Sequence, residues 1–326
     1  MEPKKIADPA RDGRAASALH RSTARRFSRL ARRGQTSILL AILLPSLVGA
    51  IALGVDISVF YFNWAKLQRA ADAAALAGAA HLPSDTAAAT SAATSYATLN
   101  SIAGSEIALN QIAGDHLSMT VQFSRTVPYY FAKVLGLSSG IVVARATATV
   151  KTAGAARHVI PIGVQHNTVY TYGQQLTLNT GVAPGNWHPL ALGGNGASVY
   201  GNNIVNGYQG VIHVGDMLPT ETGVMTGPTK SSFDTRIAAG LSQFPSDTFS
   251  NHSLNNPRVV VAPMVDFAGI NGSSQVPVKG FAVLWLSSVA SSGKAITAYF
   301  IKQTVPGSEP GSGGTNYGAY RAALTS

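Results

Sequence analysis

Residues 32–81 read RRGQTSILLAILLPSLVGAIALGVDISVFYFNWAKLQRAADAAALAGAAH, and this stretch decides how the rest of the chain is interpreted. The part from Thr36 to Val55 contains no Asp, Glu, Lys, Arg or His. A helix of that length extends for about 30 Å, which matches the hydrocarbon core of a bilayer. Aromatic side chains follow at once, as they do where a span meets the headgroups: Phe60, Tyr61, Phe62 and Trp64. The stretch therefore predicts a membrane-spanning helix.

The helix is expected to continue beyond the membrane. Residues 65–80 are mostly alanine, an excellent helix former, so the pattern predicts one long helix over residues 34–82. Pro45 lies inside the span, where a proline is tolerated. Gln68 and Asp72 are four residues apart and can pair along one face of the helix.

The formal net charge of +10 is concentrated before this helix. Residues 1–33 hold ten Lys and Arg against three acids, so they contribute +7 (10 − 3) and the rest of the chain contributes +3. A basic flank before an apolar span indicates a cytoplasmic N-terminus. We therefore expect a disordered basic tail at 1–33, a single-pass protein of the cytoplasmic (inner) membrane, and an extracytoplasmic segment over 56–326. Nucleic acid is not an expected partner, because no RNP-like, helix-turn-helix or zinc-ligand pattern accompanies the charge.

Two features of the span leave alternatives open. Ala50-Ile51-Ala52 has the A-x-A spacing of a signal-peptide cleavage site, although the basic segment before it is long for a signal peptide. Small residues recur every four positions, at Ser46, Ala50, Gly54 and Ser58. Such a stripe lets another helix approach closely and suggests self-association, while small residues are also common in spans without a partner.

A small α+β unit is expected over residues 83–152. Ser84 or Asp85 is a candidate N-cap for a helix over 85–101. The next elements are a half-buried strand, a short amphipathic helix with Gly136 as its C-cap, and a second strand: 117–123, 127–135 and 141–150. The segment 151–157 has the composition of a linker.

Residues 158–305 are expected to form a β-rich domain, so that the fold class of the chain is α+β. One helix is predicted at 232–243, and Gly and Asn turns separate the strands. The predicted strands are 158–165, 174–180, 189–193, 210–214, 258–265, 276–288 and 294–304. The composition of residues 306–326 indicates a flexible tail.

The first stretch also resembles a family. Its motifs are Arg33-Gly34-Gln35 with Pro45, then Gly54-Val55-Asp56, then the run from Leu67 to Ala77 that holds Gln68, Ala71 and Asp72. Together they resemble the N-terminus of TadG-like proteins of Flp pilus assembly, also called tight-adherence (Tad) proteins. The runs at 128–137 and 144–148 look similar to that family, and so, more loosely, do 258–265 and 278–281.

The resemblance implies a single-pass inner-membrane protein that serves pilus assembly or secretion, with the bilayer and other pilus-assembly or envelope proteins as partners. It carries over no catalytic residue. Related minor pilins keep a Glu five residues after a cleavage glycine. Counted from Gly34, that position here is Leu39. Larger relatives carry an Asp-x-Ser-x-Ser metal loop, and the nearest string here, residues 56–60, lacks the second Ser, so no metal is assigned.

Asp56 at the end of the span permits two interpretations. The carboxylate either marks the outer interface, where water and headgroups solvate it, or pairs with a cation on a neighbouring helix.

Enzyme motifs are weak. The chain has no cysteine, and its eight histidines show no metal-site spacing. The string Gly136–Gly140 fits G-x-S-x-G, but the elements predicted around it have the wrong order for a nucleophile elbow. Four residues of the β-rich domain could meet in a hydrolase site: His188, His213, Asp216 and Glu221. We expect no catalytic residue, no cofactor and no metal.

Three functions are thus carried forward. The first is a non-catalytic structural or assembly component of a Tad (Flp-type) pilus or secretion apparatus. The second is an adhesin-like binding module on a membrane stalk, with Trp187 and Tyr200 as its candidate partner surface. The third is an extracytoplasmic hydrolase.

Overall fold

The computed structural model describes residues 12–167, 170–179, 187–222, 225–268, 273–305, 309–310 and 315–325. The chain divides into two compact units, which we describe separately. Unit 1 comprises residues 1–63 and 126–142, and unit 2 comprises residues 64–125 and 143–326. These boundaries differ from the sequence-based ones, so the separate folding of residues 83–152 and of residues 158–305 stays a prediction.

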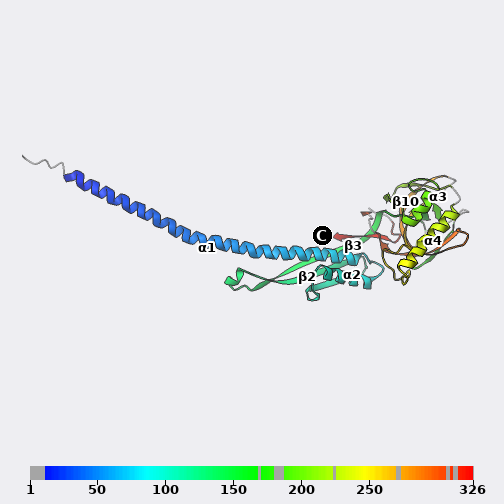
Figure 1. Cartoon of the computed structure of the whole chain (residues 1–326), viewed down its shortest axis with the longest axis horizontal. Coiled ribbons are helices and arrows are strands. Elements are labelled where there is room, and N and C mark those ends of the chain that lie inside the picture. Colours follow the sequence, from blue (N-terminus) through cyan, green and yellow to red (C-terminus); the bar gives the residue numbers. More distant parts are fainter. Residues whose placement is uncertain are drawn as a thin grey trace, which may run out of the picture. The chain divides into compact units, whose positions relative to one another are not determined.

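Helix α1 (Asp12–Ala79) contributes residues to both units and is drawn as one continuous coil in Figure 1. The predicted long helix is therefore present, and Pro45 lies inside it. The helix already begins at Asp12, which corrects the expectation of a disordered segment up to residue 33. Residues 12–33 are rich in Ala and Arg, both strong helix formers. Residues 1–11 lie outside the described part of the chain.

The second segment of unit 1 is the turn of a hairpin. It comprises the end of β2 (Ser118–Pro128), the short 3₁₀ helix η2 (Ala132–Leu135) and the start of β3 (Ser139–Ala156). Gly136 ends η2 with φ at 84°, in the left-handed region that a glycine adopts without strain. The predicted short helix at 127–135 is therefore found only over 132–135, with Gly136 as its cap, and residues 127–128 belong to the end of β2.

Unit 2 begins with the last part of α1, which packs on α2 (Thr86–Leu99) and on β2. The predicted helix at 85–101 and its cap are confirmed, because the Asp85 carboxylate accepts a hydrogen bond from the Ala88 amide at 2.8 Å. The alanines at this interface are fully buried: Ala70, Ala71, Ala74, Ala75, Ala79, Ala89, Ala93 and Ala97. Small side chains allow the two helices to approach closely.

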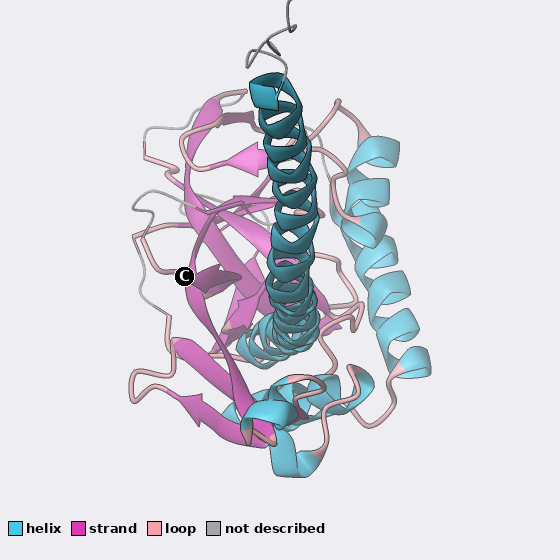
Figure 2. Ribbon diagram, turned by 90° about the vertical axis from the view of Figure 1, so that its left-hand side faces the viewer, coloured by secondary structure: helices cyan, strands magenta, loops and turns pink. Residues whose placement is uncertain are grey.

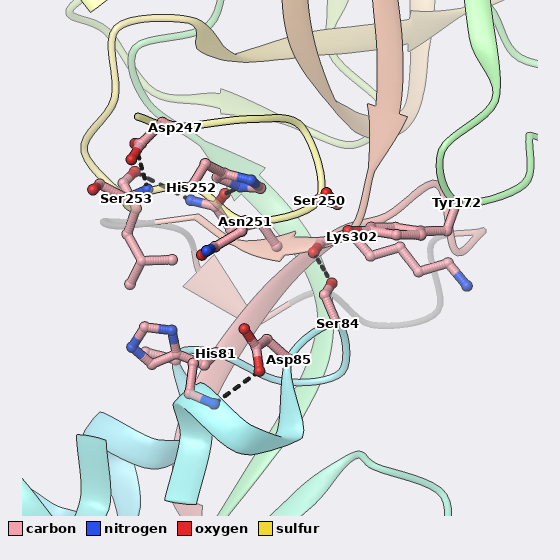
Figure 3. A pocket seen from close by; sticks show the side chains of 14 residues that line it. His81, Ser84, Asp85, Tyr172, Asp247, Ser250, Asn251, His252, Ser253 and Lys302 are labelled. Atoms are coloured by element: carbon pink, nitrogen blue, oxygen red, sulfur yellow. Dashed lines mark hydrogen bonds between the residues drawn. The ribbon is translucent and has the colours of Figure 1, made fainter. Parts of the chain in front are cut away.

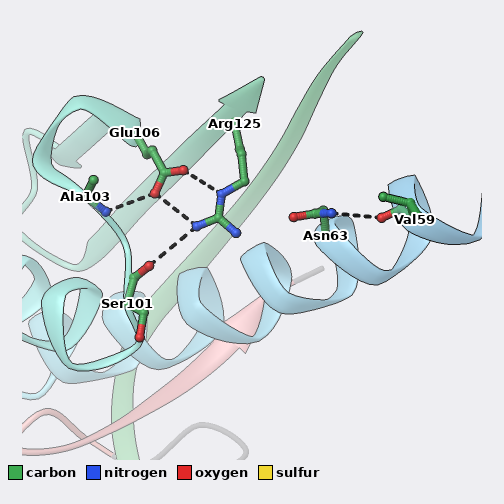
Figure 4. Close-up of polar contacts among 6 residues, drawn as sticks. All are labelled: Val59, Asn63, Ser101, Ala103, Glu106 and Arg125. Carbon is green, nitrogen blue, oxygen red and sulfur yellow. Dashed lines mark hydrogen bonds and ion pairs between the residues drawn. The ribbon is translucent and has the colours of Figure 1, made fainter. Parts of the chain in front are cut away.

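An ion pair fixes the connection between α2 and the first sheet (Figure 4). The Arg125 guanidinium donates from Nε to Glu106 Oε1 at 2.5 Å and from Nη2 to Oε2 at 3.0 Å. Glu106 Oε2 also accepts from the Ala103 amide at 2.9 Å, at the start of the 3₁₀ helix η1 (Gly104–Glu106). These hydrogen bonds, above all those from Arg125, lower the pKa of Glu106.

In the described part of the chain, the first sheet has the strand order β1-β2-β3-β14-β12, with β7 and β13 also paired to β3. Its remaining strands are β1 (Ile107–Ile112), β7 (Ile212–His213), β12 (Gln303–Thr304), β13 (Glu309–Pro310) and β14 (Ala319–Thr325).

Strand β3 corrects one expectation. It continues through residues 151–156, where the sequence suggests a linker. The alternation of buried positions persists there, with Ala153 and Ala155 both buried, so the segment still fits a half-buried strand.

The C-terminal residues correct another. Strand β14 lies between β3 and β12, with Tyr320 opposite Thr152, where the sequence suggests a flexible tail. Tyr320 and Ala319 are buried, and this burial offsets the entropy of ordering the segment. Residues 306–308, 311–314 and 326 lie outside the described part.

The second sheet has the order β5-β11-β10-β9-β4-β6, with β8 paired to β10. Its strands are β4 (Ile162–Gln165), β5 (Gln175–Asn179), β6 (Trp187–Pro189), β8 (Met217–Pro219), β9 (Val259–Val265), β10 (Gln275–Val289) and β11 (Ala295–Ile301). Most predicted strands are found, but the one at 189–193 is wrong, because β6 already ends at Pro189. Figure 2 shows the strands in magenta.

Two helices cover one face of this sheet. Helix α4 (Thr226–Gln243) begins six residues before the predicted start at 232. Helix α3 (Ala197–Asn206) lies in the glycine-rich stretch, for which the sequence predicts no helix. Tyr200 and Ile204 of α3 and Phe233 of α4 belong to the same buried cluster as the strands.

Strand β10 is buried on both faces and organises the core. Ala282, Leu284 and Leu286 face the cluster with α3 and α4, whereas Val283 and Trp285 face the cluster shared with β8 and β14. Because side chains alternate along a strand, a strand buried on both faces needs an unbroken apolar run, and residues 281–286 supply one.

Candidate functional site

The candidate site lies in unit 1, on the apolar part of α1. In the described part of the chain one helix is long and apolar enough to cross a membrane, and its candidate segment is Thr36–Ala79. Its apolar side chains are exposed rather than packed: Ile38, Leu39, Leu40, Ile42, Leu43, Leu44, Leu47, Val48, Ile51, Leu53 and Val55. So large an apolar surface is costly in water, and a bilayer would remove that cost.

Asp56 stands directly after this surface and is only 3% exposed. The amides of Tyr130 and Ala132 each donate to its carboxylate at 2.7 Å, one to each oxygen. The Phe131 amide lies 3.3 Å from Oδ1 and 3.1 Å from Oδ2. An ionised carboxyl offers only acceptors, so three backbone donors match it. Asp56 thus holds the hairpin turn against α1 and satisfies the amides at the start of η2.

A ring stack reinforces the same contact. Phe60, one helical turn after Asp56, stacks on Tyr129 with ring centroids 4.8 Å apart and planes inclined by 10°. Gly140 of β3 passes close by, since a Cβ there would lie 2.6 Å from the Tyr129 hydroxyl oxygen and 2.8 Å from Phe60 Cζ. We call Asp56, Phe60, Gly140 and residues 129–132 the Asp56 clamp.

The clamp differs from both interpretations of Asp56 that the sequence suggests. Backbone amides of the hairpin turn satisfy the carboxylate, a role that neither interpretation includes. The run at 128–137 resembles the same family as the span, but nothing in the sequence joins the two. One usable signal was that this turn between two strands is unusually apolar.

The other sequence-predicted positions of α1 have different surroundings. Gln68 Nε2 donates to Asp72 Oδ1 at 2.9 Å, which confirms that pair, and also to the Arg145 carbonyl at 3.0 Å. Ala71 is fully buried in unit 2. Gly34 and Gln35 are helical in their backbone.

The small-residue stripe lies on the exposed part of α1. A Cβ on Gly54 would meet nothing within 4 Å. The hydroxyls of Ser46 and Ser58 donate to the carbonyls of Ile42 and Gly54, at 2.9 and 2.7 Å, so they are satisfied within their own helix. The stripe is therefore open to a neighbouring helix. The hydroxyls of Ser46 and Ser58 need no hydrogen bond from such a helix.

Tyr200 corrects the predicted partner surface of the β-rich domain. It is 2% exposed, and its hydroxyl lies 3.1 Å from Thr229 Oγ1. Its ring fills the space between α3, α4 and the sheet, so it contributes to the core. Trp187 begins β6, and its side chain lies outside the described part.

A polar cleft of about 280 Å³ lies in unit 2, between the connection of α1 with α2 and the loop at 247–254. Figure 3 shows His81 and Asp85 on one side and Asn251 and His252 on the other. Its acids have structural partners: Asp85 caps α2, and Asp247 Oδ2 accepts from the Ser253 amide at 2.7 Å and from Asn256 Nδ2 at 3.0 Å. Burial lowers the pKa of His81. These contacts brace two loops.

Of the four residues of the hydrolase hypothesis, His213 and Asp216 form a pair, and the side chains of His188 and Glu221 contact other residues. His213 Nδ1 lies 3.6 Å from Asp216 Oδ2 within one turn, while the His188 ring packs against Phe267 and Glu221 accepts from the Gly196 amide at 3.1 Å. Among the described residues, no group of three or more His, Asp or Glu could hold a metal ion. The G-x-S-x-G string has η2 before it and β3 after it, the order that the sequence predicts for a plain turn.

Comparison with known proteins agrees with the sequence motifs of α1. Residues 34–81 match the Tad family, described as putative Flp pilus-assembly TadE/G-like. The matched Tad segment contains the apolar surface, Asp56 and the buried alanine face, so the predicted resemblance is confirmed there. A search of curated proteins and one of solved structures gave no match.

Proposed function

We propose that this chain is a membrane-anchored structural or assembly component of a Tad (Flp-type) pilus or secretion apparatus, without catalytic activity of its own. One observation carries the proposal: the segment that matches the Tad family coincides with the helix whose apolar side chains lie exposed. In this role α1 anchors the protein, and unit 2 contacts other pilus or envelope components.

The charge distribution supports one orientation in the cytoplasmic membrane. The basic residues of 1–33 precede the span, which favours a cytoplasmic N-terminus and places the bulk of the chain outside the cytoplasm.

Lateral association through α1 is part of the same proposal. Ser46, Ala50 and Gly54 would let a second α1 helix, or a helix of another assembly protein, approach closely. Asp56 is already occupied by the hairpin turn, so the stripe acts by van der Waals packing rather than through an intramembrane ion pair.

The adhesin-like alternative receives no support from Tyr200, which is buried. The hydrolase alternative needs convergent His and acid residues. His213 and Asp216 lie together in one turn, whereas the side chains of His188 and Glu221 contact other residues.

Topology and processing test the proposal together. Tags at both ends of the full chain, cell fractionation and protease treatment of spheroplasts should show a full-length membrane species with a protected N-terminal tag and a digested C-terminal tag. A shortened soluble species that begins near Leu53 would contradict the anchor and identify the span as a signal peptide. Ala52→Leu is the matched variant, because it removes the A-x-A cleavage site. If the span is an anchor, the variant and the natural chain should have the same size.

A further inference from the structure

The hairpin tip, residues 129–140 of unit 1, exposes an apolar surface of its own. Val134 is 88% exposed and Leu135 is 81% exposed. Three more large apolar side chains of the tip are exposed: Tyr130, Phe131 and Leu137. Lys133 is the only charged residue of the tip. A surface turn normally carries polar side chains, so this composition needs an explanation.

The clamp fixes where the tip lies along α1. The chain enters the tip at Tyr129, beside Phe60, and leaves it at Gly140, again beside Phe60. Between these points its amides bind Asp56, which lies four residues, or about 6 Å, nearer to the uncharged span. The turn therefore points along α1 toward the apolar surface, which ends at Val55.

The backbone of the tip is suited to an apolar phase. Three of its amides donate to Asp56, and four more donate to carbonyls within the tip: Tyr129 to Ser138, Val134 to Phe131, Gly136 to Lys133, and Leu137 to Ala132. A turn that enters a bilayer must satisfy its backbone donors internally, because lipid offers few partners.

We propose that the hairpin tip inserts into the interfacial layer of the outer leaflet and forms a second membrane contact beside the α1 span. The proposal rests on the proposed function, since it requires α1 to cross the bilayer. Lipid fits this surface because the tip is continuous with the apolar surface of α1. The Lys133 ammonium can extend to the headgroups from its apolar stem, and Tyr130 and Phe131 suit the interfacial layer. Two contacts would fix the tilt of unit 1 in the membrane, which a single helix leaves free.

Depth measurements on single-cysteine variants test this insertion. The natural chain has no cysteine, so Val134→Cys gives one labelling site in the full-length protein. The labelled protein is reconstituted into phosphatidylcholine–phosphatidylglycerol vesicles, and an environment-sensitive fluorophore is quenched by doxyl lipids or by aqueous iodide. Leu47→Cys in the span and Ser91→Cys, exposed on α2, give the lipid and water references.

We expect the label at residue 134 to be quenched at least about twofold more by doxyl lipids than by iodide, as for a side chain at interfacial depth. Asp56→Asn should make the label at residue 134 more accessible to iodide and less accessible to doxyl lipids. Leu135→Glu should have the same effect without altering the Asp56 clamp. A water-exposed label at residue 134 with a lipid-exposed label at residue 47 would overturn the insertion and leave the anchor intact. Protection from both quenchers would mean that protein covers the tip, which also overturns the insertion. Water exposure at both positions would overturn the anchor as well.

Discussion

The two parts of helix α1 use apolar residues in opposite ways. Over residues 36–55 most side chains are large and exposed, whereas over residues 67–79 most are alanines and the inward face is fully buried. The large side chains of the first part lie at the surface of the protein. The second part has little volume, which brings α2 and β2 within contact of the helix.

This difference shows that an apolar helix has no single meaning. Large exposed side chains suit a fluid solvent such as lipid, which adapts to their shape. Small buried side chains suit a fixed protein neighbour, because a close-packed interior is destabilised when a side chain adds excess volume. Asp56 and Phe60 separate the two parts, and each contacts the hairpin turn.

The largest expected effect comes from adding volume to the buried part. At Gly78 a Cβ would lie 3.0 Å from the Ala89 carbonyl oxygen and from Met119 Cγ. Gly78→Leu should therefore destabilise unit 2 by about 3 kcal/mol. For a unit of this size the melting temperature should fall by about 10 °C. The fluorescence of the buried Trp285 in detergent-solubilised protein reports the transition.

Gly49→Leu is the matched control, because a Cβ at Gly49 would meet nothing within 4 Å. It should leave the melting temperature of unit 2 unchanged. Equal losses in the two variants would refute the distinction between the parts of α1.

The next effect concerns the Asp56 clamp. Asp56→Ala leaves the amides of Tyr130, Phe131 and Ala132 without their acceptor, which destabilises the turn locally. Hydrogen exchange of these amides should become about 30-fold faster while the core of unit 2 keeps its protection. Asp115→Ala serves as control, since Asp115 accepts one backbone bond from Leu117 in unit 2. Unchanged exchange at residues 130–132 would show that the carboxylate does not hold the turn.

A smaller effect is expected for the stripe of small residues. Gly54→Leu should weaken self-association of the full chain in vesicles about fivefold, measured by energy transfer between labelled copies, because a large side chain separates the helices. Gly49→Leu again provides the control, since Gly49 lies five residues away and points to another side of the helix. Association that survives Gly54→Leu would remove this face from the proposed contacts.

Much of the fold was predictable because the relevant forces are local. An uncharged run, an alanine run, a cap at Asp85 and alternating strands all depend on neighbours in the sequence. Two errors came from reading composition as disorder: residues 12–33 are helical, and β14 completes a sheet. A strand such as β14 is stabilised by pairing with β3, far away in the sequence, and a single sequence does not show that pairing.

The sequence did not predict the Asp56 clamp for the same reason. Asp56 and Tyr130 are 74 residues apart, and a carboxylate that binds backbone amides needs no particular side chain on the other segment. The prediction for Tyr200 was wrong because it assumed exposure. An aromatic residue among glycines suggests a surface loop, but Tyr200 lies in helix α3 and is buried.

The smallest expected effect is a pH dependence confined to unit 2. The hydrogen bonds from Arg125 lower the pKa of Glu106, so folding favours the ionised carboxylate. The stability from this pair is complete above the unfolded pKa of about 4.3 and is lost as the pH falls through the lower folded value. The pair is partly solvated, so the loss should be below about 1 kcal/mol.

Glu106→Gln and Arg125→Gln should each flatten the fall in the melting temperature of unit 2 between neutral pH and about pH 3, and the double variant should add nothing further. Parallel curves for the natural chain and Glu106→Gln would show that another carboxylate controls the acid transition. Asp247 is the next candidate: burial opposes its ionisation, but hydrogen bonds from Asn256 and Ser253 leave its pKa lowered. Because Glu106 and Arg125 both belong to unit 2, this dependence should persist in Asp56→Ala, which separates the stability of unit 2 from that of the clamp.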